Sequence, residues 1–465
     1  MNPPPPSTPL RAAGEGRKDV TELLLDLVAA NRQGTAVGLC SICSANPYVL
    51  EATLQKAVRD ETIVCVESTS NQVNQFGGYT GMTATGFRDF VAAHAAAAGL
   101  ADDGVLLGGD HLGPYPWRHE PADTAMANAC ELVRSCVAAG YAKIHLDASM
   151  RCADDPGAEA APLPEEIATQ RTAELCAAAE TTAAQLPAGS PSPLYVIGTE
   201  VPTPGGEEAG QAGPSVTPVA DVEHTLDLTR DAFRRAGLAG AWQRVVAVVV
   251  QPGVEFGDAS VTAYDRTAAS GLSAFVKRQP RLVYEAHSTD YQGAEALLHL
   301  VEDHFAILKV GPWLTFAFRE AVFALEEIEK EVLRGGPGAQ PSRLRDVLDA
   351  AMVQHPEHWA AYYSGSPDEV RRKRAFSYSD RCRYYWPRPE VQGALAGLLR
   401  NLSERPIPVV LVQQFLPESA GAVQEGRLPA EPAALIHHHI ERVLDLYAAV
   451  CGDELDESGR HGQER

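Results

Sequence analysis

The sequence predicts an α/β protein, a (β/α)8 TIM barrel with a mostly helical C-terminal appendage. Eight short apolar runs recur between residues 36 and 312, and a segment of helical character follows each. Nearly continuous apolar runs of this length are typical of buried parallel strands. Eight strand-then-helix units in about three hundred residues indicate the barrel. A doubly wound open sheet is the alternative, but no GxGxxG follows the first strand, so a dinucleotide site lacks support.

The predicted elements alternate regularly along the chain. The strands are expected at 36–45, 62–70, 104–111, 142–149, 194–201, 244–253, 281–288 and 305–312. The helical segments are expected at 48–58, 86–99, 126–140, 164–180, 222–237, 262–278, 293–303 and 315–332. A further helix at 20–32 precedes the first strand, and we expect it to close the bottom of the barrel.

Changes in composition divide the chain into four parts. Residues 1–18 are a Pro-rich lead-in that we expect to be disordered. Residues 19–334 are expected to form the TIM barrel as the catalytic domain. Residues 335–452 are expected to be a helical appendage packed on the barrel, and residues 453–465 a charged, solvated tail.

Charge and cysteine content exclude several classes of partner. The net charge is -22 and no Lys/Arg cluster is present, so we expect no nucleic-acid or membrane partner. No run has the length of a membrane span or of a signal core. Nine cysteines in apolar segments suit a reducing cytoplasm better than a disulfide framework. Cys40 and Cys43 form a single CxxC, which we interpret as two buried strand cysteines on opposite faces.

Polar residues gather where the predicted strands end, which is where TIM barrels carry their chemistry. In chain order they are Glu67, Ser68, Thr69, Asp110, His111, Asp147, Ser149, Glu200, Gln251, Glu255, His287, Ser288, Thr289, Asp290 and Lys309. One mouth of the barrel is therefore expected to hold two histidines, several carboxylates, amides and a lysine.

This set predicts a site for one divalent metal ion. His111 and His287 are the expected imidazole ligands, which suit zinc, manganese, nickel or cobalt. Glu255, or less favourably Gln251, would be the third protein ligand. A lone histidine at a strand end is more often structural, so the hypothesis depends on having two across the barrel.

Other residues at the mouth are assigned to proton transfer or to packing. Asp110 and Glu200 are the predicted acid/base residues. His119, His145 and the histidines at 437–439 are interpreted as surface or packing residues.

The stretch SNQVNQFGGYTGM predicts contacts to a polyhydroxy substrate. Its amides come from Asn71, Gln72, Asn74 and Gln75, and Gly78 allows close approach of the backbone. A tightly turned, self-hydrogen-bonded loop is the alternative. The other predicted substrate contacts are Asp147, Ser149, Ser288, Thr289, Asp290 and Lys309, although Asp147 could equally accept hydrogen bonds from loop amides.

Several long motifs together resemble a known family. They are SNQVNQFGGYTGMT, GGDHLGP, HLDASM, GTEVPTPGG, YEAHSTDYQ, LKVGPWLTFAFREA and DRCRYYWP. They resemble the Z-type (GatZ/KbaZ-like) subunits of class II D-tagatose-bisphosphate aldolase, from about Gly38 to Tyr447. The resemblance implies a TIM barrel distantly similar to class II aldolases. It implies either a non-catalytic subunit that stabilises an aldolase or a ketohexose-phosphate 4-epimerase.

The class II aldolase pattern carries over in part. By this resemblance Asp110 is an acid/base residue, His111 and His287 are metal ligands, and Glu200 is the strand-five carboxylate. The strand-six histidine ligand of the aldolases is missing, so Gln251 or Glu255 would have to replace it. The glycine-rich phosphate nest after the strand-seven histidine is also missing, although Ser288, Thr289 and Lys309 could hold a phosphate at a different position.

We therefore expect a metal-dependent ketohexose 4-epimerase that interconverts D-fructose 6-phosphate and D-tagatose 6-phosphate, or the free ketoses. The alternatives are a stabilising subunit of an aldolase whose catalytic subunit is a separate chain, and an aldolase in its own right. We also expect a homo-oligomer. Arg381 and Arg383 either reach a substrate phosphate or pin the appendage, and pinning is the favoured interpretation.

Overall fold

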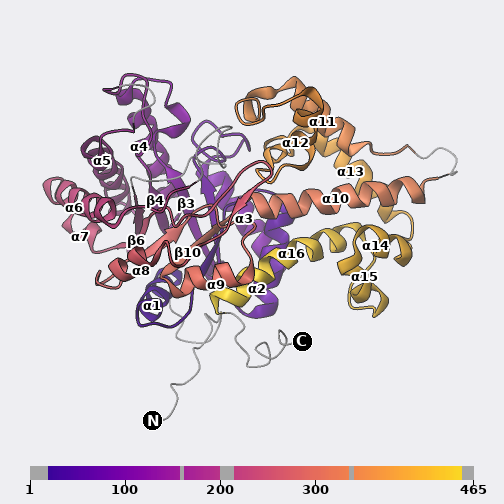
Figure 1. Ribbon diagram of the computed structural model, residues 1–465, viewed down its shortest axis with the longest axis horizontal. Helices are drawn as coiled ribbons and strands as arrows, with labels where there is room; N and C mark the ends of the chain where they lie inside the picture. The colour runs from indigo at the N-terminus through magenta and orange to yellow at the C-terminus, as the bar shows by residue number, and fades with distance from the viewer. Residues whose placement is uncertain (1–18, 158–161, 199–213, 335–339, 453–465) are drawn as a thin grey trace, which may run out of the picture.

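Eight parallel strands close into a barrel, which confirms the predicted fold class (Figure 1). The structure, a computed structural model, describes residues 19–157, 162–198, 214–334 and 340–452. The strands follow one another around the barrel in the order β1-β10-β9-β6-β5-β4-β3-β2. They are β1 (Leu39–Ile42), β2 (Val64–Thr69), β3 (Val105–Leu112), β4 (Lys143–Leu146), β5 (Leu194–Ile197), β6 (Val245–Val249), β9 (Val283–Ala286) and β10 (Phe305–Val310). Each predicted strand segment overlaps one of them.

Apolar side chains fill the lower end of the barrel. Leu39, Cys65 and Leu106, from three neighbouring strands, belong to a buried cluster that also contains Leu24 and Leu27. These two leucines lie on helix α1 (Val20–Arg32). Helix α1 therefore covers the N-terminal end of the barrel, and the C-terminal ends of the strands remain for the polar residues.

Helices follow the strands and form the outer layer of the barrel. They are α2 (Pro47–Asp60), α3 (Ala84–Ala98), α4 (Ala122–Ala138), α5 (Glu165–Ala183), α6 (Val219–Arg235), the short α7 (Ala239–Trp242), α8 (Ser270–Val276) and α9 (Ala294–Glu302). Local sequence sets their ends. The Asn46 side chain, for example, accepts the Tyr48 N–H at 3.0 Å at the start of α2, where Pro47 is the first helical residue.

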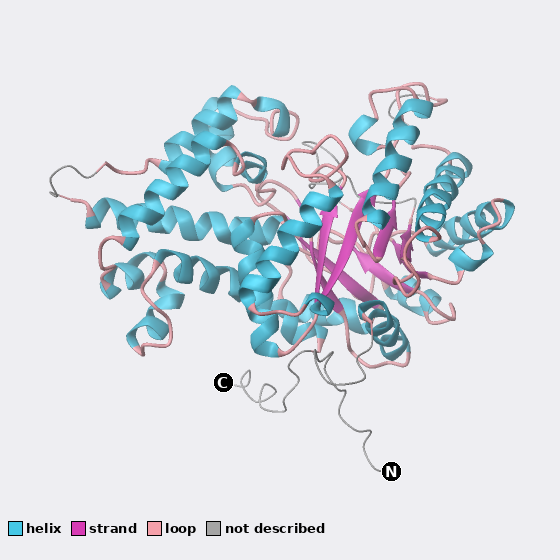
Figure 2. Cartoon of the chain, turned by 180° about the vertical axis from the view of Figure 1, so that it is seen from behind, coloured by secondary structure: helices cyan, strands magenta, loops and turns pink. Residues whose placement is uncertain are grey.

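In the described residues, the regular structure of the C-terminal region consists of helices, and the region lies to one side of the barrel (Figure 2). Helix α10 (Pro312–Val332) leads into it from β10. The region contains α11 (Leu344–Gln354), α12 (Pro367–Phe376), the 3-10 turn η4 (Arg381–Tyr385), α13 (Pro389–Ser403), α14 (Val409–Phe415), α15 (Pro417–Gln424) and α16 (Pro432–Cys451), together with the short 3-10 turn η3 (Pro356–His358).

Helix α16 returns to the barrel and packs against α2, α9 and α10. The Gly38 N–H, just before β1, donates to the Cys451 carbonyl at 3.1 Å. The last helix of the appendage thus fills the place in the outer layer between α9 and α2. The appendage is built into the barrel wall rather than only attached to its surface.

One predicted helix is much shorter in the structure. The segment 262–278 is helical only over Ser270–Val276. Its first residue, Thr262, belongs instead to an antiparallel pair, β7 (Glu255–Phe256) with β8 (Val261–Thr262), and loop and turn follow up to Ala269. β-branched side chains such as those of Val261 and Thr262 favour extended backbone, which explains the difference.

Two further findings concern the whole described chain. None of the helices in the described ranges is both long and apolar enough to cross a membrane. All nine cysteines are free. Cys43 faces the barrel mouth, whereas Cys40 lines a separate cavity between β1, α2 and α16, so the two lie on opposite faces.

Candidate active site at the barrel mouth

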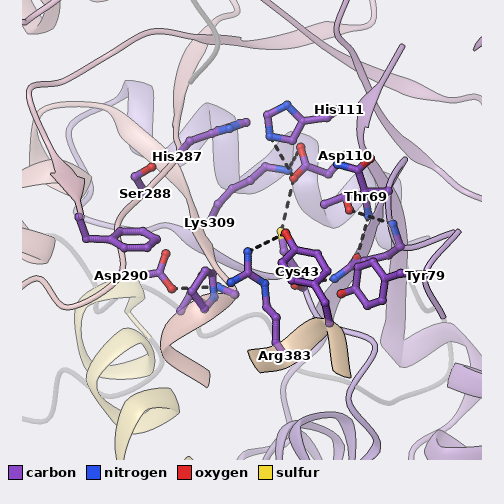
Figure 3. Close-up of a pocket in the computed structure, with 17 residues that line it drawn as sticks. Cys43, Thr69, Tyr79, Asp110, His111, His287, Ser288, Asp290, Lys309 and Arg383 are labelled. Atoms are coloured by element: carbon purple, nitrogen blue, oxygen red, sulfur yellow. Dashed lines mark hydrogen bonds and ion pairs between the residues drawn. The ribbon is translucent and has the colours of Figure 1, made fainter. Parts of the chain in front are cut away.

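A cavity of about 100 Å³ opens at the C-terminal ends of the barrel strands (Figure 3). Its lining residues come from the barrel strands, from the loops that follow them, and from two positions in the appendage. They are Cys43, Thr69, Asn71, Gln72, Tyr79, Asp110, His111, Phe256, His287, Ser288, Asp290, Lys309, Val310, Gly311, Pro312, Arg383 and Tyr384. The mouth therefore gathers much of the polar set that the strand ends predict.

Three buried histidines meet beside this cavity. His111 lies at the end of β3, His145 lies in β4, and His287 follows β9. The ring centroids of His111 and His287 are 4.8 Å apart, and each lies 5.2 Å from that of His145. Three imidazoles bound to one tetrahedral ion at about 2.0–2.1 Å would have centroids about 5 Å apart. The ring centroids have this spacing, although His111 is not among the residues whose ligand atoms lie within 4.8 Å of those of both His145 and His287.

Each histidine has one ring nitrogen beside a carboxylate oxygen. The pairs are His111 Nδ1 with Asp147 Oδ2 at 2.8 Å, His145 Nδ1 with Asp110 Oδ1 at 2.9 Å, and His287 Nε2 with Glu285 Oε1 at 3.0 Å. In the described part of the chain, the other nitrogen of His145, Nε2, is buried and has no hydrogen-bond partner. A carboxylate on the far nitrogen is how proteins orient a metal-bound histidine.

Carboxylate oxygens lie within the same space. One ligand atom from each of Asp110, His145, Glu285 and His287 falls within 4.8 Å of all the others. His111 is outside this group, but its Nε2 is 3.7 Å from Asp110 Oδ2 and its ring is the near neighbour of the other two. Imidazole nitrogens and carboxylate oxygens are thus both available to a divalent ion.

Two buried lysines connect the carboxylates. Lys143 Nζ lies 2.5 Å from Glu67 Oε1 and 2.5 Å from Glu285 Oε2. Lys309 Nζ contacts Glu67 and lies 2.5 Å from Asp110 Oδ1 and 3.3 Å from Glu285 Oε1. These contacts hold the carboxylates in fixed positions under the cavity.

The network determines which groups are charged. Burial alone would raise the pKa of Asp110, but His111, Lys309 and His145 outweigh it and hold that pKa well below its ordinary value. Burial lowers the pKa of Lys309, yet Asp110, Cys43 and the nearby glutamates raise it well above the ordinary value. Lys309 is therefore an ammonium ion rather than a nucleophilic amine. Burial lowers the pKa of His287 to about 4, so this imidazole is neutral, as a metal ligand must be.

The buried charges of the cluster do not cancel. Four carboxylates and two ammonium groups, all less than 5% exposed, leave two negative charges when the histidines are neutral. The carboxylates are Glu67, Asp110, Asp147 and Glu285, and the ammonium groups are Lys143 and Lys309. Buried charge without compensation is costly. A divalent cation bound by neutral histidines would offset this charge, whereas without a cation burial is outweighed by Asp110 and Asp147, which raise the pKa of His111 and favour its protonation.

The backbone around two site residues adopts an uncommon conformation. His111 has φ 47° and Ser288 has φ 54°, the left-handed region that L-residues rarely occupy. Such residues cost about 1–3 kcal/mol and concentrate at functional sites. Just after His111, a Cβ on Gly113 would lie 1.6 Å from the Asp147 carbonyl oxygen. Only glycine fits at position 113, where the chain after β3 passes close to the Asp147 backbone. This close approach brings Asp147 alongside His111.

The structure places the predicted metal ligands in two groups. It brings His111 and His287 together as expected, and a third imidazole, that of His145, which sequence reasoning assigned to packing, lies beside them. Glu255 and Gln251 do not line the cavity. Their side chains instead accept backbone N–H groups: Glu255 Oε1 from Phe256 at 3.0 Å, and Gln251 Oε1 from Gly253 at 2.8 Å. Glu200 lies outside the described residues.

The predicted substrate contacts divide into two groups. Asn71, Gln72, Ser288, Asp290 and Lys309 line the cavity, whereas Asn74, Gln75, Gly78, Asp147, Ser149 and Thr289 do not. The Asn74 side chain donates to the Ser70 carbonyl and accepts the Phe76 and Gly78 N–H groups. This is the self-hydrogen-bonded loop that was the alternative interpretation.

The remaining members of the second group make contacts within the protein. Gln75 Nε2 donates to the Asn128 carbonyl at 3.0 Å. Ser149 Oγ donates to Asp147 Oδ1 at 2.6 Å, and Thr289 Oγ1 donates to the Lys309 carbonyl at 2.6 Å. These positions support the site rather than face the cavity.

Sequence reasoning did not place His145, Lys143, Glu285 or Cys43 at the site. A signal for the first three exists in the strand pattern. Side chains two residues apart share one face of a strand. Lys143 and His145 therefore point inward with Asp147, and Glu285 does so with His287.

The two arginines of η4 differ in position. Arg381 Nε donates to the His358 carbonyl, and its guanidinium lies 3.2 Å from the centroid of the Tyr362 ring, both within the appendage. Arg383 instead lines the cavity. The favoured interpretation, that the arginines hold the appendage in place, describes the contacts of Arg381. It does not account for the position of Arg383 at the cavity.

Comparison with known proteins identifies a family and several solved structures. A family model described as D-tagatose-1,6-bisphosphate aldolase subunit GatZ/KbaZ-like matches residues 24–452. A crystal structure from Sinorhizobium meliloti 1021, called a "probable tagatose 6 phosphate kinase", has a TM-score of 0.80 and 45% identity, covering 89% of this chain and 100% of its own.

Aldolase structures are much less similar. The fructose-bisphosphate aldolase of Campylobacter jejuni has a TM-score of 0.43 at 11% identity and covers 85% of this chain and 94% of its own. The YdjI aldolase of Escherichia coli K12 has a TM-score of 0.38 at 10% identity, covering 78% and 95%. Similarity this low does not bear on the activity of this chain.

Proposed function

This chain belongs to the D-tagatose-1,6-bisphosphate aldolase subunit GatZ/KbaZ-like family, and from that premise we propose that it is itself a metal-dependent ketohexose 4-epimerase. The reaction would interconvert D-fructose 6-phosphate and D-tagatose 6-phosphate, or the free ketoses. The observation that carries the proposal is the meeting of three carboxylate-paired histidines beside the cavity that Asp110, His111 and His287 line.

The cluster suits a divalent transition-metal ion. His111, His145 and His287 would hold it, and such an ion would satisfy the unpartnered Nε2 of His145 and offset the excess of buried carboxylates over ammonium groups. Zinc, manganese, nickel or cobalt all accept imidazole ligands. When bound, the ion would supply Lewis acidity that stabilises an enediolate.

The chemistry follows from the substrate. The C4 hydrogen of a 2-ketose is β to the carbonyl and is not acidic, so C4 cannot be inverted by simple deprotonation. Removing the C4 hydroxyl proton lets C4 become an aldehyde while the C3–C4 bond pair passes into a C2–C3 enediolate. The aldehyde rotates, C3 attacks its opposite face, and the proton returns to the C4 oxygen. No oxidant or reductant is consumed.

Asp110 is the proposed acceptor of the C4 hydroxyl proton. It lines the cavity, and the low pKa set by its cationic neighbours keeps it ionised. Lys309 and His145 fix the orientation of the carboxylate. Glu200 remains the proposed second acid/base residue, which would exchange the C4 hydroxyl proton on the opposite face of the aldehyde.

The other proposed roles concern binding. Asn71, Gln72, Ser288 and Asp290 would contact the hydroxyl groups of the substrate. Asp147, with Ser149 donating to it, would act through His111 rather than on the substrate.

A second function has support from the family description, which names an aldolase subunit. In that case the chain would stabilise a separate aldolase catalytic subunit. It would turn over nothing alone, and its stable state would be a hetero-complex rather than the homo-oligomer we expect for the enzyme.

The metal requirement tests the epimerase proposal. The purified chain is stripped with EDTA, reloaded with manganese, zinc, nickel or cobalt, and given fructose 6-phosphate. We expect tagatose 6-phosphate by chromatography from the reloaded protein, none from the stripped protein, and none from His111→Ala. Glu255→Gln is the matched control and should retain activity. No product with any ion would favour the subunit function.

A further inference from the structure

We propose that Arg383 binds the phosphate of a sugar-phosphate substrate, so that the C-terminal appendage completes the substrate site. The proposal rests on the proposed epimerase function and specifies its substrate as the phosphorylated ketose. Arg383 and its neighbour Tyr384 are the cavity-lining residues that come from the appendage. Figure 3 shows Arg383 on the opposite side of the cavity from His111 and His287.

Arg383 forms no ion pair with a carboxylate in the part of the chain that the structure describes. Its Nη1 donates to the carbonyls of Ser379 and Asp380, the latter at 3.2 Å, and its Nη2 donates to Tyr384 Oη at 3.0 Å. All three acceptors are uncharged. These contacts fix the guanidinium in place at the cavity wall without a direct ion pair, although Asp380 and Asp290 are near enough to interact with its charge.

The acid that would neutralise Arg383 is already committed elsewhere. Asp380, three residues earlier in the chain, receives Arg319 Nε at 2.6 Å and Thr315 Oγ1 at 2.7 Å. Both partners lie on α10, which begins directly after β10. The buried Asp380–Arg319 pair thus anchors η4 to α10 and holds Arg383 at the cavity.

The cavity therefore has two chemically different sides. The side with His111, His287 and Asp110 suits the reacting carbons. The Arg383 side offers a guanidinium, whose planar set of donors matches phosphate oxygens. Within the described residues, the Ser288 hydroxyl also lines the cavity and forms no side-chain hydrogen bond, so it can donate to the same group. Asp290, the acid on this wall, has its Oδ1 occupied by the Gly311 and Trp313 N–H groups.

Binding measurements test the proposal without requiring turnover. Fructose 6-phosphate, fructose and inorganic phosphate are titrated calorimetrically into the wild-type chain and into Arg383→Gln. We expect the variant to bind fructose 6-phosphate and phosphate at least about tenfold more weakly, the effect of losing a charged hydrogen bond, and to bind fructose unchanged. Arg383→Lys, which keeps the charge but not the fork of donors, should fall between the two.

Arg388→Gln is the matched control. Arg388 lies just after η4, pairs with Glu357 at 3.4 Å and does not line the cavity, so this variant should bind all three ligands like the wild type. Equal binding of fructose 6-phosphate by Arg383→Gln and wild type would overturn the proposal, as would an equal loss of fructose and fructose 6-phosphate. Binding that depends on Arg383 without any tagatose 6-phosphate formed would leave the phosphate site standing and reject the epimerase.

Discussion

Asp147 Oδ2 lies 2.8 Å from His111 Nδ1, and both groups are buried at the barrel mouth. Gly113 allows this contact because the chain after His111 passes directly over the Asp147 backbone. The pairing fixes which nitrogen of His111 remains for a metal ion. Asp147 is therefore a positioning residue, and its removal should act on metal affinity rather than on the fold.

Asp147→Asn should weaken metal binding by about 10- to 100-fold, the usual effect of changing a carboxylate behind a histidine ligand. The measurement is a titration of the EDTA-stripped protein with zinc or manganese, with circular dichroism to verify the fold. Ser149→Ala, which removes a donor to Asp147 but leaves the contact with His111, should change affinity much less. Equal affinity in Asp147→Asn and wild type would show that the pair is purely structural.

His145→Ala should lower metal affinity by more than about a hundredfold, because it removes a ligand rather than a supporting residue. Glu255→Gln should stay within about threefold of the wild type, since Glu255 does not line the cavity. The same titration compares the two variants. A larger loss of metal affinity in Glu255→Gln than in His145→Ala would favour the ligand set predicted from sequence and would exclude His145 as a ligand.

Lys143→Met should lower the free energy of unfolding by about 3–5 kcal/mol, because it leaves Glu67 and Glu285 buried without this partner. Urea unfolding followed by fluorescence measures the loss. Lys330→Met is the matched control, since Lys330 is 45% exposed and its surface pairs should contribute less than about 1 kcal/mol. Similar losses in the two variants would mean that the buried network contributes little to stability.

Asp290→Asn should change how stability depends on pH. Burial raises the pKa of Asp290 to about 6, although the Trp313 and Gly311 N–H groups oppose this. The folded protein thus holds this proton more tightly than the unfolded chain, in which the carboxyl titrates near 3.8. Wild-type stability should therefore fall relative to Asp290→Asn as pH rises from about 4 to about 6. Thermal melts measure the difference in stability between the wild type and Asp290→Asn at each pH. A difference that stays constant from about pH 4 to about pH 6 would contradict the raised pKa of Asp290.

The barrel was predictable because each strand carries its own apolar signal, and the eight runs fall on the eight strands. The predicted helix at 262–278 failed because Val261 and Thr262 pair locally with β7, which depends on the preceding loop rather than on helical pattern. The place of α16 in the barrel wall was not predictable, since nothing in its sequence specifies α2 and α9 as neighbours.

The site was predictable where polar residues stand at strand ends, as with Asp110, His111 and His287. His145 was missed because it lies one residue before the strand end, among apolar neighbours, where an ordinary core histidine looks the same. Arg383 could not be assigned, because its place at the cavity depends on the Arg319–Asp380 contact between distant segments.

The central claim is that this chain alone inverts C4 of a ketohexose phosphate by breaking and remaking the C3–C4 bond. Fructose 6-phosphate deuterated at C4 tests it most directly, with the metal-loaded chain and no partner protein. We expect tagatose 6-phosphate that retains the C4 deuterium, because the bond between C4 and its deuterium never breaks in this route. Product that has lost the deuterium would contradict the retro-aldol route, and no product would contradict the epimerase itself.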